Sequence, residues 1–333
     1  MNANPGRRSS DRDDIFDVAG FGTIVVDQIS LVPHYPAPDE KLAADEMLIQ
    51  PGGPVPAALS VLSRFGRKTV LAGCIGDDLW GEWLLKSLAA RMIATDFLVS
   101  VPGTRTPFAQ ICADRTRGTR AVIHDEGSLP ALTLPLLGLR CDGATPSQRA
   151  SDILRQLPQA RCLHIDGREH DTIPLIIDEY RKRGTKISID CGTFRRRTIE
   201  LLPLVDCIIM PASFARSVFG QRPLDRLVAD SHDAWLQASH IVITNGEQGS
   251  VGWCNGEIIQ QGAWPVSALD SCGAGDIHAG AILHAFLEDW PLSRALPFAA
   301  AAAALKCTTL GNGTLPKDLD DVFLFLDEQT QAR

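Results

Sequence analysis

The stretch Asp270–Gly280 combines very small residues with a carboxylate at the point where an apolar helix is expected to begin. Gly273, Ala274 and Gly275 have almost no side chain, so their amide N–H groups can point at a ligand without steric hindrance. The positive end of the following helix points the same way. Such a set of donors suits the oxygens of a phosphate in transfer.

Asp276 stands at the start of this helix. It is poorly suited to binding a phosphate, because like charges repel, but it is well placed to accept the proton of a hydroxyl group that attacks one. The alternative is an ordinary helix cap, since acidic residues favour helix starts for stability alone. The stretch alone leaves both interpretations open, and the rest of the chain must decide between them.

The bulk composition is that of a globular enzyme. The chain has 333 residues, 45% of them hydrophobic and 22% charged, which allows one large α/β domain or two domains. Its net charge of −8 disfavours nonspecific nucleic-acid binding, although local basic groups can still hold an anionic substrate. No apolar run reaches the length of a membrane span. We therefore expect no nucleic-acid partner and no membrane association.

The nine cysteines are scattered without a C-x-x-C pair, which indicates free thiols in a cytoplasmic protein. No zinc pattern is present, and no residues are predicted to ligate a metal directly. Residues 1–14 are polar, have balanced charges, lack an apolar signal segment and are predicted to form a disordered tail. The folded part is therefore expected to begin at residue 15.

The remaining chain has the rhythm of an α/β fold. The β-branched run 23–27 is predicted to be a buried strand that ends at Asp27, where such a sheet presents groups to ligands. Strands are also expected at 16–20, 69–76, 161–167, 186–190, 206–210 and 240–244, and helices at 55–65, 171–183, 212–219, 231–238 and 295–307. This alternation predicts a Rossmann-like, mainly parallel sheet flanked by helices. A single domain is expected over 15–330, with a small β-sheet lid built from segments near 28–50 and 104–125.

Two local features have both a structural and a functional interpretation. Gly52 and Gly53 would let the backbone approach a small ligand, or they form a simple turn. Arg120 lies on the strand side of a basic turn, where it points inward or remains a solvated hairpin arginine. Residues 245–249 are predicted to form a hairpin turn that leads into a strand at 250–254.

The order of these features resembles the PfkB, or ribokinase-like, carbohydrate kinases from about residue 15 to residue 326. Residues 270–276, DSCGAGD, resemble the C-terminal signature of that family, D-T-x-G-A-G-D. Gly52-Gly53 resembles the N-terminal signature, Gly22 with Asp27 the acidic substrate site, and residues 244–249 the T-x-G-x-x-G nucleotide turn. Each signature alone is weak, but four in the right order are specific.

Within the family, the chain is most similar to ketohexokinases and sulfofructose kinases. The first likeness lies in residues 26–32, 124–130 and 164–168, and the second in residues 53–54 and 304–308. Pro54 and Ala57 stand where family members commonly carry two asparagines that contact sugar hydroxyls. This departure puts simple ribose- or fructose-type recognition in doubt.

The resemblance implies transfer of the ATP γ-phosphoryl group to a primary hydroxyl of a small sugar, a ketose or a sulfo-ketose. Asp276 would be the general base, with an anion hole formed by the amides of Gly273, Ala274 and Gly275 and with Arg120 neutralising phosphate charge. The substrate would be bound by Asp27, Gly52, Gly53, Lys41, Arg168 and His124, and the nucleotide by Thr244, Gly246, Gly249, Cys307 and Gly311. Arg168 is the residue that could bind a carboxylate, sulfonate or phosphate through two parallel hydrogen bonds.

The resemblance also implies cofactors and partners. Mg²⁺ would bridge the ATP phosphates and contact the protein mostly through water. A monovalent cation such as K⁺ and a homodimer formed through the lid are further expectations from analogy alone.

Three alternatives stay open or are disfavoured. A kinase for a nucleoside or a sugar acid shares the fold. A non-catalytic sugar-binding sensor is supported by the missing asparagines and opposed by Asp276 with its glycine turn. A NAD-dependent dehydrogenase is disfavoured, because residues 20–22 lack the third glycine of G-x-G-x-x-G.

Overall fold

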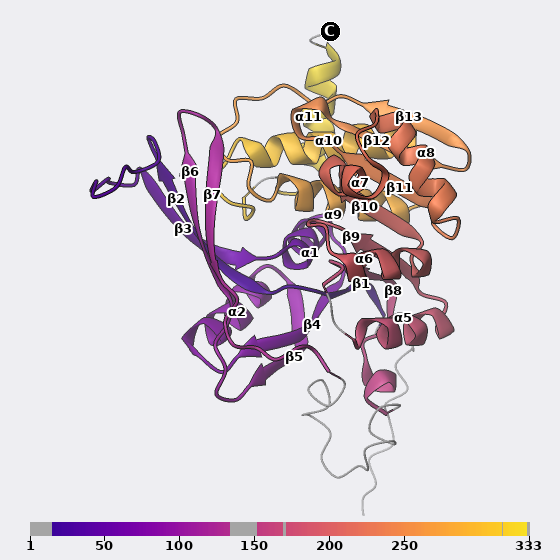
Figure 1. The fold of residues 1–333 in the computed structure, drawn as a ribbon, viewed down its shortest axis with the longest axis horizontal. Helices are drawn as coiled ribbons and strands as arrows, with labels where there is room; N and C mark the ends of the chain where they lie inside the picture. The colour runs from indigo at the N-terminus through magenta and orange to yellow at the C-terminus, as the bar shows by residue number, and fades with distance from the viewer. Residues whose placement is uncertain (1–14, 134–151, 169–170, 315, 332–333) are drawn as a thin grey trace, which may run out of the picture.

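The computed structural model describes residues 15–133, 152–168, 171–314 and 316–331. It contains a nine-stranded sheet in the order β13-β12-β11-β10-β9-β8-β1-β4-β5 and a separate four-stranded sheet in the order β3-β2-β6-β7. Figure 1 shows the small sheet projecting from one side of the large one, at the left of the view. The α/β fold expected from the sequence, with a Rossmann-like core and a small second sheet, is confirmed. The predicted tail 1–14 lies outside the described residues.

The large sheet is parallel from β5 to β11, and only β12 and β13 run antiparallel to their neighbours. Its inner strands β1, β4 and β8 to β11 are mainly buried, as parallel strands between two helix layers must be. The strands are β1 (Phe16–Phe21), β4 (Thr69–Gly76), β5 (Ile93–Val101), β8 (Ala160–Ile165), β9 (Lys186–Asp190), β10 (Cys207–Pro211), β11 (His240–Thr244), β12 (Ser250–Cys254) and β13 (Glu257–Gln261).

The small sheet consists of β2 (Val25–Val32), β3 (Glu46–Gly52), β6 (Phe108–Asp114) and β7 (Thr119–Asp125). Its central pair, β2 and β6, is parallel, and both outer pairs are antiparallel. The register places Gln50, Asp27, Ala109 and His124 in one row across the four strands. Because side chains alternate along a strand, this row and the rows two residues away share one face of the sheet.

The sequence prediction was wrong about how Asp27 is presented. Asp27 does not end a strand of the large sheet but is the third residue of β2 in the small sheet. The chain leaves β1 at Phe21, turns through residues 22–24 and changes sheet before reaching Asp27. Asp27 therefore approaches the large sheet from outside, across the space between the two sheets.

Helices cover both faces of the large sheet. On one face α1 (Pro54–Arg64), α2 (Leu79–Ala90), α9 (Ala274–Leu287), α10 (Leu292–Cys307) and α11 (Leu319–Gln331) form one apolar core with the sheet. On the other face α5 (Ile173–Lys182), α6 (Arg196–Leu201), α7 (Ala212–Phe219) and α8 (Leu224–Ala234) form a second core. No helix among the described ranges is long and apolar enough to span a membrane.

One local prediction was wrong and one is confirmed. The helix expected at 231–238 is α8, which begins at Leu224 because Pro223 caps it in an extended conformation and Asp225 favours its first turn. The hairpin turn expected over residues 245–249 is confirmed, because β11 and β12 pair antiparallel with Thr244 opposite Ser250, and the loop contains a short 3-10 helix over Gly246–Gln248.

The position of α9 depends on one glycine. A Cβ atom on Gly280 would overlap Val61 Cγ1 of α1 and would lie 2.8 Å from the Ala58 carbonyl oxygen. Glycine therefore lets α9 and α1 approach closely over the sheet. Figure 1 shows both helices near the centre of the molecule. The N-terminal end of α9 carries the turn of residues 270–276, the signature turn.

Candidate active site

Asp276 lies in the first turn of α9. This helix begins directly after Gly273, which adopts the left-handed conformation. Gly273 caps the helix with φ 81° and ψ 0°, a conformation that few other residues adopt. The amides of the first helical turn have no partner four residues earlier in the helix, so they are available to an anion. The Ala274 amide donates a long hydrogen bond to the Ser271 carbonyl at 3.3 Å, which it would exchange for a phosphate oxygen.

Asp27 is buried opposite this turn. A Cβ atom on Gly52 would overlap the Asp27 carboxylate, and one on Gly53, whose φ is 100°, would overlap the Thr23 carbonyl. The two glycines therefore let the end of β3 and the start of α1 pack against the Asp27 carboxylate and the Thr23 carbonyl. The structure gives this packing reason for both glycines, and contact of their backbone with substrate stays a prediction.

The electrostatics show that the two carboxylates are close. Burial, and after it the charge of Asp276, raise the pKa of Asp27 to about 7, while a hydrogen bond from Gln50 opposes the shift. Burial also raises the pKa of Asp276 to about 6, against the charges of Arg120 and Lys306, which lower it. Both carboxyl groups therefore titrate close to neutral pH, so Asp276 can take up a proton there.

Two more aspartates belong to this group and were not selected from the sequence. Asp166 follows β8 and accepts the Thr23 amide at 2.6 Å, and Asp190 is the last residue of β9. Burial and the charges of Asp276 and Asp166 raise the pKa of Asp190 well above its ordinary value. Their signal in the sequence was an acidic residue at the carboxyl end of a parallel strand, which is where such sheets bind ligands.

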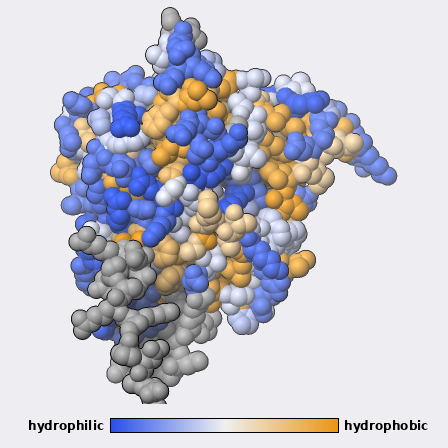
Figure 2. All heavy atoms as spheres, turned by 180° about the vertical axis from the view of Figure 1, so that it is seen from behind, coloured by the Kyte–Doolittle hydropathy of each residue, from blue (hydrophilic) through white to orange (hydrophobic). Residues whose placement is uncertain are grey.

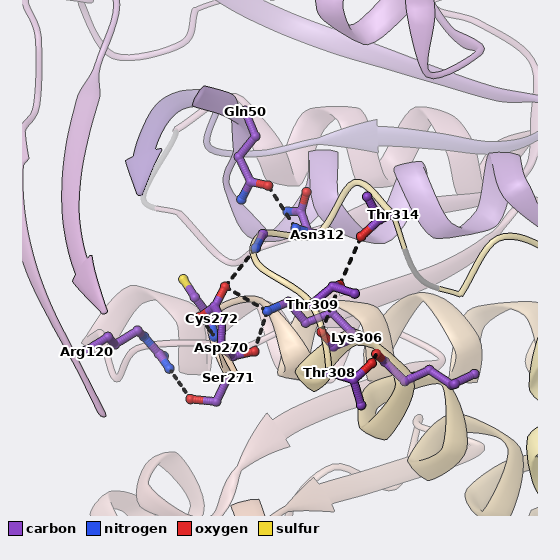
Figure 3. Close-up of polar contacts among 12 residues, drawn as sticks. Gln50, Arg120, Asp270, Ser271, Cys272, Lys306, Thr308, Thr309, Asn312 and Thr314 are labelled. Carbon is purple, nitrogen blue, oxygen red and sulfur yellow. Dashed lines mark hydrogen bonds and ion pairs between the residues drawn. The ribbon is translucent and has the colours of Figure 1, made fainter. Parts of the chain in front are cut away.

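Arg120 connects the small sheet to the signature turn. It extends from β7, and its Nη1 donates to Ser271 Oγ at 3.3 Å (Figure 3). Arg120 shares a face of β7 with His124, because the two residues are four apart on the strand. The inward orientation is thus the one that the structure shows, and the charge of Arg120 acts on Asp276.

A second network lies behind the turn and is centred on Asp270, which is buried (Figure 3). Its Oδ1 accepts the Cys272 amide at 2.7 Å, and its Oδ2 accepts the Gly311 amide at 2.9 Å. The ammonium of Lys306 donates to Oδ2 at 3.0 Å and to the Asp270 carbonyl at 2.6 Å. Lys306 was not predicted, because a lysine in an alanine-rich helix gives no sign in the sequence that it is buried.

The network continues to the small sheet through the loop after α10. Gln50 Oε1 accepts the Asn312 amide at 2.8 Å, and Arg91 Nη1 donates to Asn312 Oδ1 at 2.9 Å. Arg64 donates to the Asn312 carbonyl at 3.0 Å. The loop is therefore held between α1, the residue after α2, and β3, close to the row that contains Asp27.

These residues do not fit a monovalent cation as a resident cofactor. Carboxylate and carbonyl oxygens are the ligands that hard cations prefer, and those of Asp270 are directly behind the turn. The Lys306 ammonium already contacts both the carboxylate and the carbonyl of Asp270. The described residues also contain no group of three or more histidine, cysteine, aspartate or glutamate side chains that could hold a metal ion.

Comparison with known proteins identifies the fold and the family. A family model described as pfkB family carbohydrate kinase matches residues 16–318. The chain belongs to this family. The family predicted from the sequence signatures is confirmed, and the protein is a carbohydrate kinase.

Several relatives with assigned names are sugar kinases, and one is a nucleoside kinase. A ribokinase of Haemophilus influenzae is 25% identical over 297 residues, which cover 87% of this chain and 92% of the relative. A 5-dehydro-2-deoxygluconokinase of Geobacillus thermodenitrificans is 22% identical, and the match covers 84% of this chain and 86% of the relative. The structure of Arabidopsis thaliana ribokinase complexed with ribose and ATP has a TM-score of 0.73, 21% identity and coverage of 94% and 99%. The family model and the two named relatives support a sugar kinase without selecting a ketose or a sulfo-ketose, and the solved structure supports the fold.

The remaining predicted substrate residues of this PfkB kinase occupy different places. His124 is exposed on the row of Asp27, two strands away, which corresponds to about 10 Å. Lys41 is exposed in the connection between β2 and β3, and no contact in the described part of the chain joins it to Asp27 or Asp276. The structure therefore does not bring Lys41 together with the other predicted residues.

Arg168 lines a cavity of about 480 Å³ that lies beside Asp166. Gly22, Thr23 and Arg195 also line it, whereas Asp27 and Asp276 do not. The Nε atom of Arg168 is buried and has no hydrogen-bond partner among the described residues. A Cβ atom on Gly22 would lie 2.9 Å from the Asp166 carboxylate, so the cavity borders the aspartate group.

The predicted nucleotide residues lie at the carboxyl end of β11 and at the end of α10. Thr244 is the last residue of β11, and Gly249, with φ 86°, packs against the Gln261 carbonyl where a Cβ atom would overlap it. The Cys307 carbonyl accepts the amides of Leu269 and Asp270 at 2.7 and 3.2 Å. The end of α10 is thereby fixed beside the signature turn.

Proposed function

We propose that this PfkB kinase transfers the γ-phosphoryl group of ATP to a primary hydroxyl of a small sugar, a ketose or a sulfo-ketose. The observation that carries the proposal is the placement of Asp276 at the N-terminus of α9, opposite Asp27 and in reach of the Arg120 charge. A base, an anion-binding helix start and a buried hydrogen-bonding carboxyl thus meet at one point. This combination suits a hydroxyl acceptor and a phosphoryl donor.

In the proposed reaction, Asp27 binds substrate hydroxyls and Asp276 accepts the proton of the attacking one. The sugar oxygen forms a bond to the γ-phosphorus while the bond from that phosphorus to the bridging oxygen of ADP breaks. The amides of Gly273, Ala274 and Gly275 stabilise the charge on the transferred group. Bound with ATP, Mg²⁺ would supply neutralisation of phosphate charge, and the protein would hold it mostly through water.

The nucleotide would lie across Thr244, Gly246, Gly249, Cys307 and Gly311. Gly246 and Gly311 have φ values of 56° and 70°, so both need the conformational freedom of glycine. Cys307 is half-buried at the end of α10, where it could contact the adenine. Contact with nucleotide at these five positions is part of the proposal.

The preference for a ketose or a sulfo-ketose rests on the substrate side of the site. Pro54 and Ala57 of α1 offer no hydrogen-bonding side chain, so sugar hydroxyls must find other partners. Arg168 and Arg195 line the cavity beside Asp166 and suit an anionic group at the far end of the acceptor. The same two arginines suit a carboxylate, which makes a sugar acid the second candidate.

The outer face of the small sheet supports a homodimer. Met47 and Ile49 of β3 and Ile123 of β7 are exposed on the face that points away from Asp27. Figure 2 shows apolar residues on the part of the surface that projects at the right, where the small sheet lies. Light scattering in solution would test the dimer, and a monomer mass at all concentrations would exclude it.

The test of function is ADP release measured over a panel of fructose, sulfofructose, ribose, sugar acids and nucleosides. We expect the highest kcat/KM on a ketose or a sulfo-ketose, and a non-catalytic sensor would release no sugar-dependent ADP on any of them. Arg168→Ala should reduce turnover of anionic acceptors selectively. An equal loss on neutral and anionic sugars would exclude the anion site.

The catalytic base is tested with Asp276→Asn, which keeps the shape of the side chain and removes its basicity. We expect loss of phosphoryl transfer by about 100-fold or more, the range found for groups that act on the reacting atoms. ATP binding measured by calorimetry should be retained, because Asp276 makes no attractive contact with phosphate. Substantial residual turnover would contradict the assignment of Asp276 as base.

A further inference from the structure

Lys306 is the most unusual charged residue in the described chain, because its side chain is 0% exposed. Lysine is almost never fully buried unless it is paired. Its partner Asp270 is 1% exposed, so both charges have been removed from water. A buried pair of this kind is weak evidence for stability, since desolvation offsets much of the attraction. The position of the Lys306–Asp270 pair therefore points to a role other than stabilising the fold.

The pair holds the signature turn from behind. Two of the three N–H donors of the ammonium point at one residue, to the carboxylate and to the carbonyl of Asp270. The same carboxylate accepts the amides of Cys272, within the turn, and Gly311, in the loop after α10. Loss of the ammonium would leave a buried carboxylate uncompensated at the junction of these two segments.

The charge of Lys306 also acts at the reacting point. It lowers the pKa of Asp276, as Arg120 does from the opposite side. Arg120 is exposed on β7 and depends on the position of the small sheet, whereas Lys306 is fixed within α10. The positive charge of Lys306 therefore stays in place whatever the position of the small sheet.

We propose that Lys306 is a positioning residue that supplies, from within the chain, the cation behind the phosphoryl-transfer turn, so that the enzyme needs no bound monovalent cation. The inference rests on the proposed kinase function. It replaces the expectation of K⁺, because the ammonium contacts the carboxylate and carbonyl oxygens that a cation behind this turn would need.

The first experiment uses the unmodified protein. Turnover of the best sugar of the panel is measured in potassium chloride and in tetramethylammonium chloride at equal ionic strength. We expect the same kcat in both salts, and no rise in melting temperature with added potassium beyond that with tetramethylammonium. A requirement of the unmodified enzyme for potassium would overturn the proposal.

The second experiment uses Lys306→Met, which keeps length and removes charge. We expect kcat to fall by about 10- to 100-fold, the size typical of residues that orient a site. Lys186→Met is the matched control: Lys186 Nζ also donates to a carboxylate, Asp289 at 2.7 Å, and to the Phe286 carbonyl at 3.4 Å. Lys186 begins β9, at the end of the sheet away from the site, so kcat of this control should stay unchanged.

Two further variants separate positioning from folding. In Asp270→Asn/Lys306→Met both charges are gone, so we expect the melting temperature to recover relative to Lys306→Met while kcat stays low. In Lys306→Ala the vacated space should accept potassium, which we expect to raise both kcat and melting temperature. Full recovery of kcat in the double variant would show a merely structural pair and overturn the proposal.

These outcomes are distinguishable from failure of the proposed function. The potassium-dependent melting of Lys306→Ala needs no turnover and reports the cation site directly. If no sugar is phosphorylated but this melting response appears, the kinase assignment fails and the cation site stands. If turnover is present but Lys306→Ala shows no potassium response in either measurement, the cation site fails alone.

Discussion

At the scale of single residues, the site is built from carboxyl groups whose charge the protein disfavours. Burial raises the pKa of Asp27 to about 7 and that of Asp276 to about 6, and the two groups raise each other's free energy when both are charged. The charged state that the proposed mechanism needs is therefore held at a cost in folding stability. Such a conflict is typical of functional sites.

The sign of this cost can be tested with Asp27→Asn. The unfolded chain loses the Asp27 proton near pH 3.8 and the folded chain near pH 7, so Asp27 stabilises the fold least above pH 7. We expect Asp27→Asn to raise the free energy of unfolding at pH 8 by at most about 4 kcal/mol, and hardly at pH 4. Urea unfolding at both pH values measures this difference.

The control for this stability test is Asp39→Asn, which changes an exposed aspartate in the connection between β2 and β3 in the same way. Its unfolding curves should follow those of the unmodified protein at both pH values. If Asp27→Asn raises the free energy of unfolding equally at pH 4 and pH 8, titration of Asp27 is not the cause.

The residues that the sequence could identify are those with a local pattern. Asp276 was found because glycines and a helix start surround it in the chain, and the turn can be recognised without any distant contact. Lys306 was missed because its burial and its partner Asp270 become apparent only when residues far apart in the chain close around it on folding. Arg91 was missed for the same reason, since its partners Ser60 and Asn312 lie 31 and 221 positions away.

At the scale of elements, α9 sets the direction of the anion-binding amides. It packs on α1 through Gly280 and on α10, and all three helices share one apolar core. A shift of α9 would move the Asp276 carboxylate and the amides together. The alternation of strands and helices was predictable because burial on both sheet faces requires apolar runs, but the length of α8 depended on capping by Pro223.

Gly280→Ala tests the contact between these helices. A new methyl group would overlap Val61 Cγ1, so α9 must move or α1 must deform. We expect a loss of about 1–3 kcal/mol in the free energy of unfolding, with a fall in kcat that exceeds any change in KM. Gly262→Ala is the matched control, because nothing lies within 4 Å of the position that its Cβ atom would occupy. Unchanged stability of Gly280→Ala would contradict the close packing of α9 on α1.

At the scale of the whole molecule, the site forms where the two sheets meet. The large sheet contributes the ends of β8 and β9 and the helix start, and the small sheet contributes the row of Gln50, Asp27 and His124. The sequence predicted both sheets, but it could not show that Asp27 belongs to the small one. That assignment depends on pairing of β2 with β6, which is distant in the chain.

Arg120 tests whether the small sheet contributes to catalysis. Its charge lowers the pKa of Asp276, so Arg120→Ala should move the acidic limb of the kcat profile above its expected value near pH 6. We also expect kcat to fall by about 100-fold, as for the loss of one group that stabilises the transferred phosphate.

Arg117→Ala is the matched control on the same hairpin, because Arg117 is paired with Asp114 and makes no contact with the signature turn. If both variants change kcat equally, or if the acidic limb of Arg120→Ala does not move, Arg120 is only a surface arginine. If only Arg120→Ala changes, the small sheet supplies a catalytic charge to a site whose base lies on the large one.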